Sequence, residues 1–208
     1  ELKEAGLNMQ METVIEEIDT NHKKVFYRRN NSKKTKVTDY DKLILATGSY
    51  PAMTSVPFDK KSNLYFLKSM EDAIKAEEFL ATAKNIAVIG GGMTGVEVAR
   101  ITQDRGIQTT LIHRNKNLLN DYLDEPASRL LESWMNAEGT RLLLNTEVTE
   151  ISVDGENTVV QTANGQKIAV DGVIFTIGFR PNSYLLNQQV ELGDRGAVVV
   201  DEYMQTSC

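Results

Sequence analysis

A chain of 208 residues is long enough for one large or two small globular domains. Its 41% hydrophobic and 25% charged residues are typical of a globular protein, and no apolar stretch is long enough to span a bilayer. The formal net charge of −6 argues against nucleic acid or an acidic membrane as a partner, and the single cysteine excludes an internal disulfide framework, which favours a cytoplasmic location.

The N-terminal part of the chain is expected to be rich in β-structure. Apolar and polar residues alternate over residues 11–27, which predicts a β-hairpin. The apolar run at 40–46 predicts a strand that leads into Thr47 and Gly48. Residues 49–63 contain two of the four prolines and few periodic apolar positions, which indicates a linker.

A pattern of alternating helices and strands follows. Ser69 has acidic residues in the turn after it, which is typical of a helix N-cap. Asp154-Gly155 and Asn164-Gly165 are typical of hairpin turns. Helices are predicted at 70–83, 94–105 and 125–138, and strands at 85–89, 108–113, 141–144, 148–153, 158–162, 167–170, 173–177 and 197–200.

Strands that alternate with helices predict a parallel sheet, because parallel strands need crossover connections. The sequence therefore predicts an α/β fold, with a Rossmann-like doubly wound parallel sheet and an inserted β-hairpin or meander over residues 66–200. The chain begins with Glu1 rather than Met and ends at Cys208 without a capping or tail signal, so we expect a piece of a longer polypeptide.

Gly90, Gly92 and Gly95 fit the pattern G-x-G-x-x-G between a predicted strand and a predicted helix. The first glycine allows a sharp turn, the second lets backbone approach a pyrophosphate, and the third lets the helix pack closely on the strand. The N–H groups at the start of that helix attract phosphate. The alternative is a purely structural turn. Glu97, in the first helical turn, either complements the helix dipole or points at a nicotinamide.

The end of the second strand decides which dinucleotide is preferred. An acid there would bind the ribose 2′-hydroxyl of NAD, whereas this chain has His113, Arg114 and Lys116. Two fixed cations without a carboxylate favour the 2′-phosphate of NADP. The alternatives are a solvated basic loop and, for His113, a ring that satisfies a backbone carbonyl.

Three segments in this order resemble the pyridine nucleotide–disulfide oxidoreductases: residues 40–48 (YDKLILATG), 88–97 (VIGGGMTGVE) and 176–182 (TIGFRPN), followed by 201–204 (DEYM). Within that family the chain is most similar to the NADH oxidases, NADH peroxidases and coenzyme A-disulfide reductases. The run TLIHR at 110–114 resembles the coenzyme A-disulfide reductases, which use NADPH.

The resemblance implies a set of cofactor-binding residues and neither a catalytic residue nor a metal site in this stretch. The glycines would hold the dinucleotide pyrophosphate, Gly178 would close over the cofactor, and residues 46–48 would pass close to FAD. The whole set is Gly90, Gly92, Met93, Thr94, Gly95, Glu97, His113, Arg114, Lys116, Gly178, Ala46, Thr47 and Gly48.

The resemblance also implies a domain map. Residues 1–50 would be a partial FAD-domain segment, 51–65 a linker, 66–200 the NAD(P)-binding domain and 201–208 the return to the FAD domain. The remaining FAD and C-terminal domains of the parent chain would be its partners, and the parent would be a homodimer.

Two positions depart from the family pattern. Met93 stands where members of this branch often carry a tyrosine that shields the flavin, although a flexible thioether fills a similar space. Cys208 is at the wrong end of the chain to be the redox nucleophile of the family.

The expected function is the NAD(P)H-binding portion of a FAD-dependent disulfide reductase or NADH oxidase-like enzyme. The isolated chain would bind NADPH or NADH without turnover, because the flavin and thiol chemistry belongs to other residues. The alternative is a non-catalytic dinucleotide-sensing Rossmann module. A short-chain dehydrogenase is disfavoured because no Tyr precedes a Lys by four positions, and a methyltransferase because His113 replaces an acid.

Overall fold

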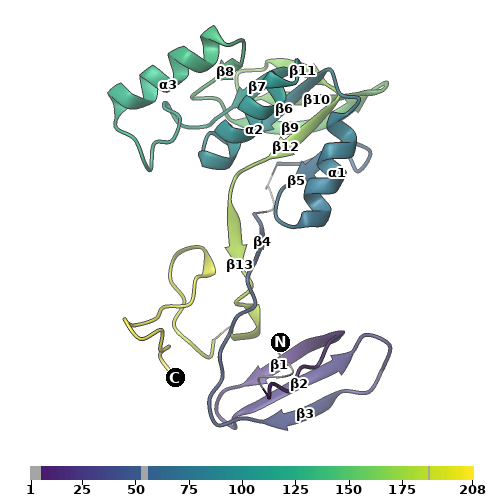
Figure 1. Ribbon diagram of the computed structural model, residues 1–208, viewed down its shortest axis with the longest axis vertical. Coiled ribbons are helices and arrows are strands. Elements are labelled where there is room, and N and C mark those ends of the chain that lie inside the picture. The colour runs from purple at the N-terminus through teal and green to yellow at the C-terminus, as the bar shows by residue number, and fades with distance from the viewer. Residues whose placement is uncertain (1–5, 53–55, 187) are drawn as a thin grey trace. The chain divides into compact units, whose positions relative to one another are not determined.

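The computed structural model describes residues 6–52, 56–186 and 188–208 (Figure 1). Contacts divide the chain into two compact units, one of Pro51–Phe179 and one of Glu1–Tyr50 with Arg180–Cys208. The sequence indicates a domain over residues 66–200. The larger unit instead begins at Pro51 and ends at Phe179. It starts earlier because Phe58, in the expected linker, makes a parallel bridge to Ile151.

The larger unit is built on the predicted parallel sheet. Its five strands lie in the order β5-β12-β6-β7-β8, and every neighbouring pair is parallel. The central strands β12 and β6 consist almost entirely of apolar residues, as expected for strands that are covered on both faces. The bounds are β5 Leu64–Phe66, β6 Asn85–Ile89, β7 Gln108–Ile112, β8 Arg141–Leu143 and β12 Gly172–Phe175.

Three helices pack on one face of this sheet (Figure 1). They are α1 Met70–Leu80, α2 Met93–Asp104 and α3 Glu125–Ala137, each within three residues of its predicted bounds. Ile86 and Val88 of β6 and Leu111 of β7 are buried against Ala99 of α2 and Met135 of α3. None of the helices in the described residues has the length and apolar character needed to cross a membrane.

The inserted meander covers the opposite face of the sheet. It consists of β9 Val148–Asp154, β10 Asn157–Thr162 and β11 Lys167–Val170 in the order β11-β10-β9. Ile151 and Val160 are buried against Ala87 and Ile89, the residues of β6 that point away from the helices. The fold is therefore Rossmann-like, with helices on one face and an antiparallel meander on the other.

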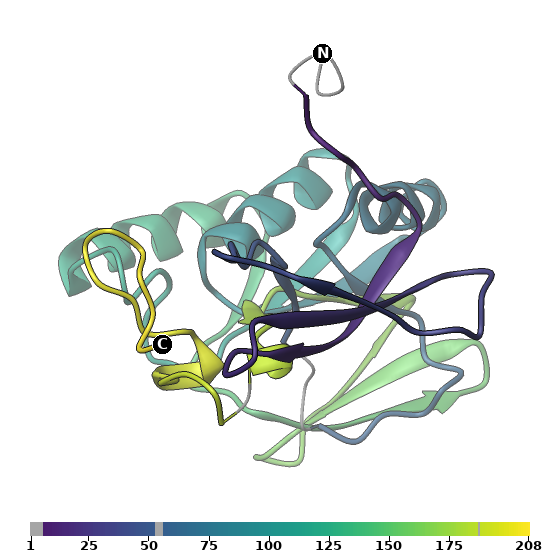
Figure 2. The same ribbon diagram turned by 90° about the horizontal axis from the view of Figure 1, so that it is seen from below.

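The smaller unit contains an antiparallel sheet, seen in front in Figure 2. The predicted hairpin is present as β1 Thr13–Asp19 and β2 Lys24–Arg29, and an unpredicted third strand, β3 Lys36–Asp39, pairs with β2. Ile18 and Val25 are buried against Leu185 and Leu186 of a 3₁₀ turn, Tyr184–Leu186. A second 3₁₀ turn spans Asp194–Gly196, and β4 Ser49–Pro51 pairs with β13 Phe179–Pro181.

Two predicted strands were wrong. Residues 40–46 form no strand: only the N–H of Tyr40 bonds to the neighbouring hairpin, at the carbonyl of Lys23, and Ile44 is 89% exposed. Residues 197–200 form only an isolated bridge between Leu192 and Val198. An apolar run becomes a strand only where a partner supplies its backbone hydrogen bonds.

The predicted cap of α1 gives a first testable expectation. The Ser69 hydroxyl accepts the N–H of Asp72 at 3.1 Å, while the Asp72 carboxylate accepts the N–H of Ser69 at 2.8 Å. Ser69→Ala should lower the free energy of unfolding by about 1 kcal/mol, measured by urea denaturation. Ser69→Asp keeps an acceptor and should show almost none of that loss. Equal losses in the two variants would contradict the capping role.

Candidate functional site

The glycine turn joins the end of β6 to the start of α2. Gly90 has a φ of 119°, and a Cβ built there would lie 2.6 Å from the carbonyl oxygen of Thr176. A Cβ on Gly95 would lie 1.8 Å from the carbonyl oxygen of Gly90, so the helix starts directly against the turn. A Cβ on Gly92 would meet nothing within 4 Å. The first and third glycines allow close packing, whereas the second faces open space.

The first turn of α2 presents backbone donors at this open side. Its N-cap, Gly92, has no side chain to cap the helix, and the first helical bond runs from the N–H of Val96 to the carbonyl of Gly92. Among the described residues no acceptor pairs with the N–H groups of Met93, Thr94 and Gly95. Unpaired N–H groups and the positive end of the helix dipole together form a site for an anion.

Thr176, which the sequence did not single out, fixes the turn from β12. Its N–H donates to the carbonyl of Ile89 at 2.8 Å, and its hydroxyl lies 3.1 Å from that carbonyl and 3.0 Å from the carbonyl of Gly90. These bonds tie the carboxyl ends of β6 and β12 together. The only sequence signal was its place at the start of the TIGFRPN segment.

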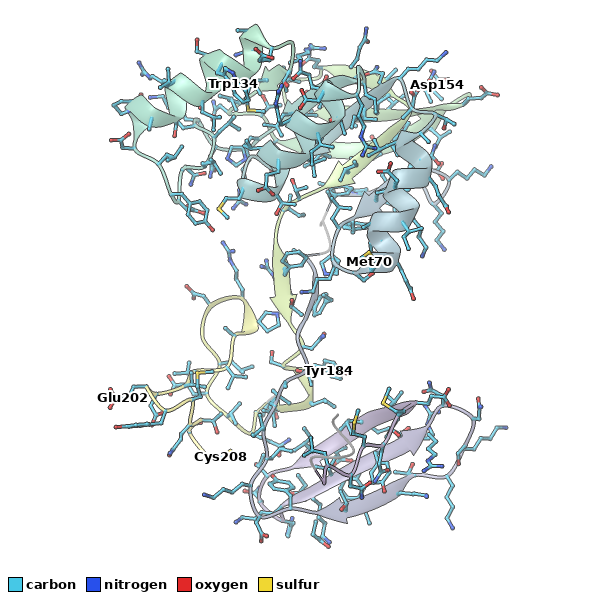
Figure 3. The ribbon with its side chains drawn as sticks, viewed as in Figure 1. Met70, Trp134, Asp154, Tyr184, Glu202 and Cys208 are labelled. Atoms are coloured by element: carbon cyan, nitrogen blue, oxygen red, sulfur yellow. The ribbon has the colours of Figure 1, made fainter. Side chains whose placement is uncertain are left out.

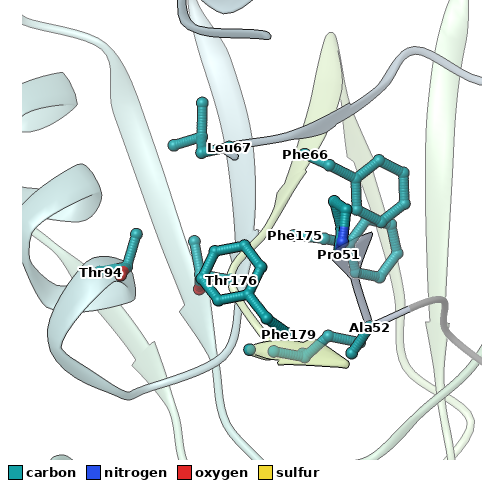
Figure 4. Close-up of a pocket in the computed structure, with 10 residues that line it drawn as sticks. Pro51, Ala52, Phe66, Leu67, Thr94, Phe175, Thr176 and Phe179 are labelled. Atoms are coloured by element: carbon teal, nitrogen blue, oxygen red, sulfur yellow. The ribbon is translucent and has the colours of Figure 1, made fainter. Parts of the chain in front are cut away.

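An apolar hollow opens beside the turn, at the carboxyl ends of β5 and β12 (Figure 4). The stacked rings of Phe66 and Phe175, with centroids 5.1 Å apart, line one side, and Thr94 of α2 lies on the other. Lys68 Nζ lies 4.6 Å from the ring centroid of Phe179 at its rim. Gly178, with a φ of 90°, also lines the hollow. No periodicity in the sequence indicated that these aromatic residues converge.

His113 contacts the glycine turn through its ring. The N–H of Gly91 donates to His113 Nδ1 at 3.0 Å, so the ring proton sits on Nε2, 3.3 Å from Asn120 Oδ1. Burial lowers the pKa of His113, and Arg114 lowers it further, while the hydrogen bond to Asn120 acts in the opposite direction. His113 Nδ1 therefore accepts a backbone N–H, while a backbone hydrogen bond with Asn117 raises the pKa of the ring, as a carbonyl acceptor would.

The two fixed cations of the basic loop have different surroundings. Arg114 is exposed and forms no ion pair with any described residue. Lys116 is paired with Glu125 at the start of α3, with 3.0 Å between Nζ and Oε1. Glu125 also pairs with Arg129, and the two cations hold the pKa of the Glu125 carboxyl below its usual value. Arg114 is the cation that is free to meet a ligand.

Met93 and Glu97 both lie on the exposed side of α2. Met93 is the first residue of the helix and is 54% exposed, and Glu97 is exposed one turn further on. The structure therefore brings Met93, Thr94 and Glu97 onto the helix that begins at the glycine turn.

The remaining predicted residues belong to the smaller unit. Asn182 binds Thr47 in both directions: its amide nitrogen donates to the Thr47 carbonyl at 2.9 Å, and its own carbonyl accepts the Thr47 hydroxyl at 2.8 Å. The N–H of Asn182 donates to the carbonyl of Gly48 at 3.0 Å, and Ala46 is exposed beside them. Cys208 is exposed in the same unit (Figure 3). Among the described residues no group of three His, Cys, Asp or Glu side chains could hold a metal ion.

The chain is similar in sequence and in fold to known proteins. The family model described as pyridine nucleotide-disulphide oxidoreductase matches residues 1–208. An NADH oxidase of Enterococcus faecalis is 34% identical over 208 residues, which is 100% of this chain and 47% of that protein. The chain thus spans about half the length of the curated NADH oxidases that it matches.

Solved structures show the same fold. The water-forming NADH oxidase of Lactobacillus brevis bound to NADH has a TM-score of 0.94 and 29% identity, covering 99% of this chain and 46% of the other. The reduced CoADR-RHD protein of Bacillus anthracis has a TM-score of 0.88 and 26% identity, covering 99% and 37%. The ordered motifs, the glycine turn with its free amides, and the family match over the full length lead to one conclusion: the chain belongs to the pyridine nucleotide-disulphide oxidoreductase family.

Proposed function

We propose that this chain is the NAD(P)H-binding portion of a FAD-dependent disulfide reductase or NADH oxidase-like enzyme. The observation that carries the proposal is the uncapped start of α2, where the N–H groups of Met93, Thr94 and Gly95 face the space left open by Gly92. A dinucleotide diphosphate fits this arrangement, because it brings the negative charge and acceptor oxygens that the amides lack. In the intact enzyme, the nicotinamide supplies a hydride to the flavin.

The apolar hollow suits the nicotinamide end of the ligand. It adjoins Thr94 on the same helix turn that holds the diphosphate, and its aromatic walls can pack against a flat ring. Gly178 would cover the cofactor from the β12 side, and the exposed carboxylate of Glu97 would lie toward the nicotinamide.

The part of the site that would bind the adenosine half of the dinucleotide is proposed to favour NADPH over NADH. Arg114 is exposed and unpaired at the end of β7, where an acid would otherwise bind the ribose hydroxyls. An engineered water-forming NADPH oxidase bound to NADPH, 29% identical to this chain, carries five substitutions, among them an acidic residue changed to alanine and the adjacent alanine changed to arginine. This chain likewise has no acidic residue at the end of β7, where His113 stands, and has an arginine, Arg114, at the next position. Lys116 would add a second cation once released from Glu125.

The proposal extends to the parent protein. Residues 1–50 would contribute to a FAD domain, with Ala46, Thr47 and Gly48 passing close to the flavin, and residues 51–65 would lead into the NAD(P)-binding domain. That domain, expected at 66–200, would end near Phe179, where the larger unit ends, and residues 180–208 would belong to the FAD domain. The remaining FAD and C-terminal domains would complete a cytoplasmic homodimer.

The test is an isothermal titration of the 208-residue chain with NADPH and with NADH. We expect saturable binding of both, tighter for NADPH, and no oxidation of either in the absence of the rest of the enzyme. Failure of both nucleotides to bind in a folded sample would reject the assignment of the site. Equal affinity would reject only the preference for NADPH.

A further inference from the structure

The ring of His113 joins two parts of the site that are far apart in the sequence. It accepts the N–H of Gly91 at 3.0 Å, and it packs so closely that a Cβ on Gly91 would lie 2.6 Å from His113 Cγ. The carbonyl of Gly91 is occupied as well, since it accepts the N–H of Leu119 at 2.9 Å. Both backbone groups of Gly91 are therefore held by the loop that follows β7.

The other side of the ring is held by the same loop. Nε2 donates to Asn120 Oδ1 at 3.3 Å, and the same oxygen accepts an N–H of Asn115 at 2.9 Å. The backbone of His113 is also fixed: its N–H donates to the carbonyl of Leu143 in β8 at 2.9 Å, and its carbonyl accepts the N–H of Thr146 at 2.9 Å. The ring has little freedom to turn without breaking one of these contacts.

We propose that His113 is a positioning residue, whose neutral imidazole holds the glycine turn in its phosphate-binding shape and whose protonation at Nδ1 weakens dinucleotide binding. This proposal rests on the proposed function, because it assigns a role within the same site. It differs from the expectation that His113 contacts the ribose or its phosphate directly.

Protonation of the ring matters because Nδ1 is the hydrogen-bond acceptor for the glycine turn. Nδ1 must be unprotonated to accept the N–H of Gly91, and an imidazolium would place two N–H donors against each other. The charged groups that act on the ring among the described residues are Arg114 and Asp121, both in its own loop. The contacts of the ring with the glycine turn and with Asn117 in its own loop, through the N–H of Gly91 and the backbone of Asn117, involve uncharged groups.

The direction of the pH effect follows from this geometry. Burial disfavours the imidazolium, so the pKa of His113 lies below its ordinary value and the ring is neutral at pH 8. As the pH falls through the lowered pKa of His113, Nδ1 is protonated and its hydrogen bond with the N–H of Gly91 is lost. The loss of one hydrogen bond corresponds to a roughly 2- to 10-fold weaker affinity. The imidazolium charge would also attract the diphosphate. Its Nδ1–H would however face the N–H of Gly91, so the turn would have to leave its phosphate-binding shape, and we take this loss to set the sign.

The experiment measures the affinity of the 208-residue chain for ADP-ribose between pH 8 and pH 5 by isothermal titration. ADP-ribose carries the diphosphate without the 2′-phosphate, whose own ionisation would confuse the result with NADPH. Histidine ring resonances followed by NMR in the same samples give the pH at which His113 titrates, and the fall in affinity should share that midpoint.

Two variants of His113 distinguish the effect of losing the hydrogen-bond acceptor from the effect of protonating it. In His113→Asn the amide oxygen stands at the position of Nδ1 and does not titrate, so the affinity should not fall with pH. In His113→Leu the acceptor is gone, so binding should be roughly 2- to 10-fold weaker than in His113→Asn at pH 8. His22→Asn, at the other histidine of the chain, should keep the wild-type pH profile.

The outcomes distinguish this proposal from the proposed function. Equal affinity of His113→Leu and His113→Asn at pH 8 would overturn the positioning role. Titration of the His113 ring without a change in affinity would overturn the role of the proton. If ADP-ribose, NADH and NADPH all fail to bind wild-type protein at pH 8, the dinucleotide site itself is wrong.

Discussion

Gly90→Ala is expected to destabilise the larger unit by about 2–4 kcal/mol and to abolish dinucleotide binding. At a φ of 119° the residue lies outside the conformations that side chains tolerate. The new Cβ would also lie 2.6 Å from the Thr176 carbonyl oxygen and 2.8 Å from its carbonyl carbon. Because Thr176 is itself bonded to Ile89, neither partner can move without opening the sheet. Urea denaturation measures the loss of stability, and titration with NADH measures the loss of binding.

Gly106→Ala is the matched control for this variant. Gly106 also has a positive φ, 77°, but a Cβ there would meet nothing within 4 Å. We expect it to lose about 1–2 kcal/mol from backbone strain alone, with unchanged nucleotide affinity. If Gly90→Ala were no less stable than Gly106→Ala, the close contact between the turn and β12 would be wrong.

Arg114→Glu should reverse the choice of cofactor. Arginine bound to a 2′-phosphate contributes charge-assisted hydrogen bonds, whose loss weakens NADPH binding by about 10- to 100-fold, and the new carboxylate adds repulsion. NADH has no 2′-phosphate, and the glutamate can accept hydrogen bonds from its ribose, so its affinity should stay equal or rise. The ratio of the two dissociation constants, measured by isothermal titration, should therefore change by about 100-fold or more.

Lys84→Glu makes the same change of charge at the opposite end of the sheet. Lys84 is exposed and immediately precedes β6, whereas Arg114 follows the carboxyl end of β7. This control should leave the ratio of affinities unchanged. A ratio that responds equally to both variants would mean that net charge, not a contact with Arg114, selects the nucleotide.

Features that depend on local sequence could be predicted. The spacing of Gly90, Gly92 and Gly95 specified the turn: a Cβ on Gly90 or Gly95 would clash with backbone, and Gly92 leaves the space before the helix open. The start of α1 followed from Ser69, because a cap needs only residues within the next turn. The parallel sheet followed from the alternation of helices with apolar strands.

Features that depend on distant partners could not be predicted. All four residues of β3 are exposed, so its sequence has no alternation of buried apolar and exposed polar side chains that would predict a strand. Residues 40–46 show the opposite case: Tyr40 and Leu45 pack against the core of the smaller unit, but the segment joins no described strand. The role of His113 was hidden for the same reason, since its acceptor function depends on the N–H of Gly91, 22 positions away. The aromatic hollow likewise joins Phe66 to Phe175 across two strands.

The central claim is that the amides at the start of α2 hold the diphosphate. The most direct measurement is an amide NMR titration of the isotopically labelled chain with NADH. The account predicts saturable shifts, with one dissociation constant, for the amides of Gly92, Met93, Thr94 and Gly95, and almost none for Gly165 in the turn between β10 and β11. Saturable binding that leaves these four amides unchanged would contradict it.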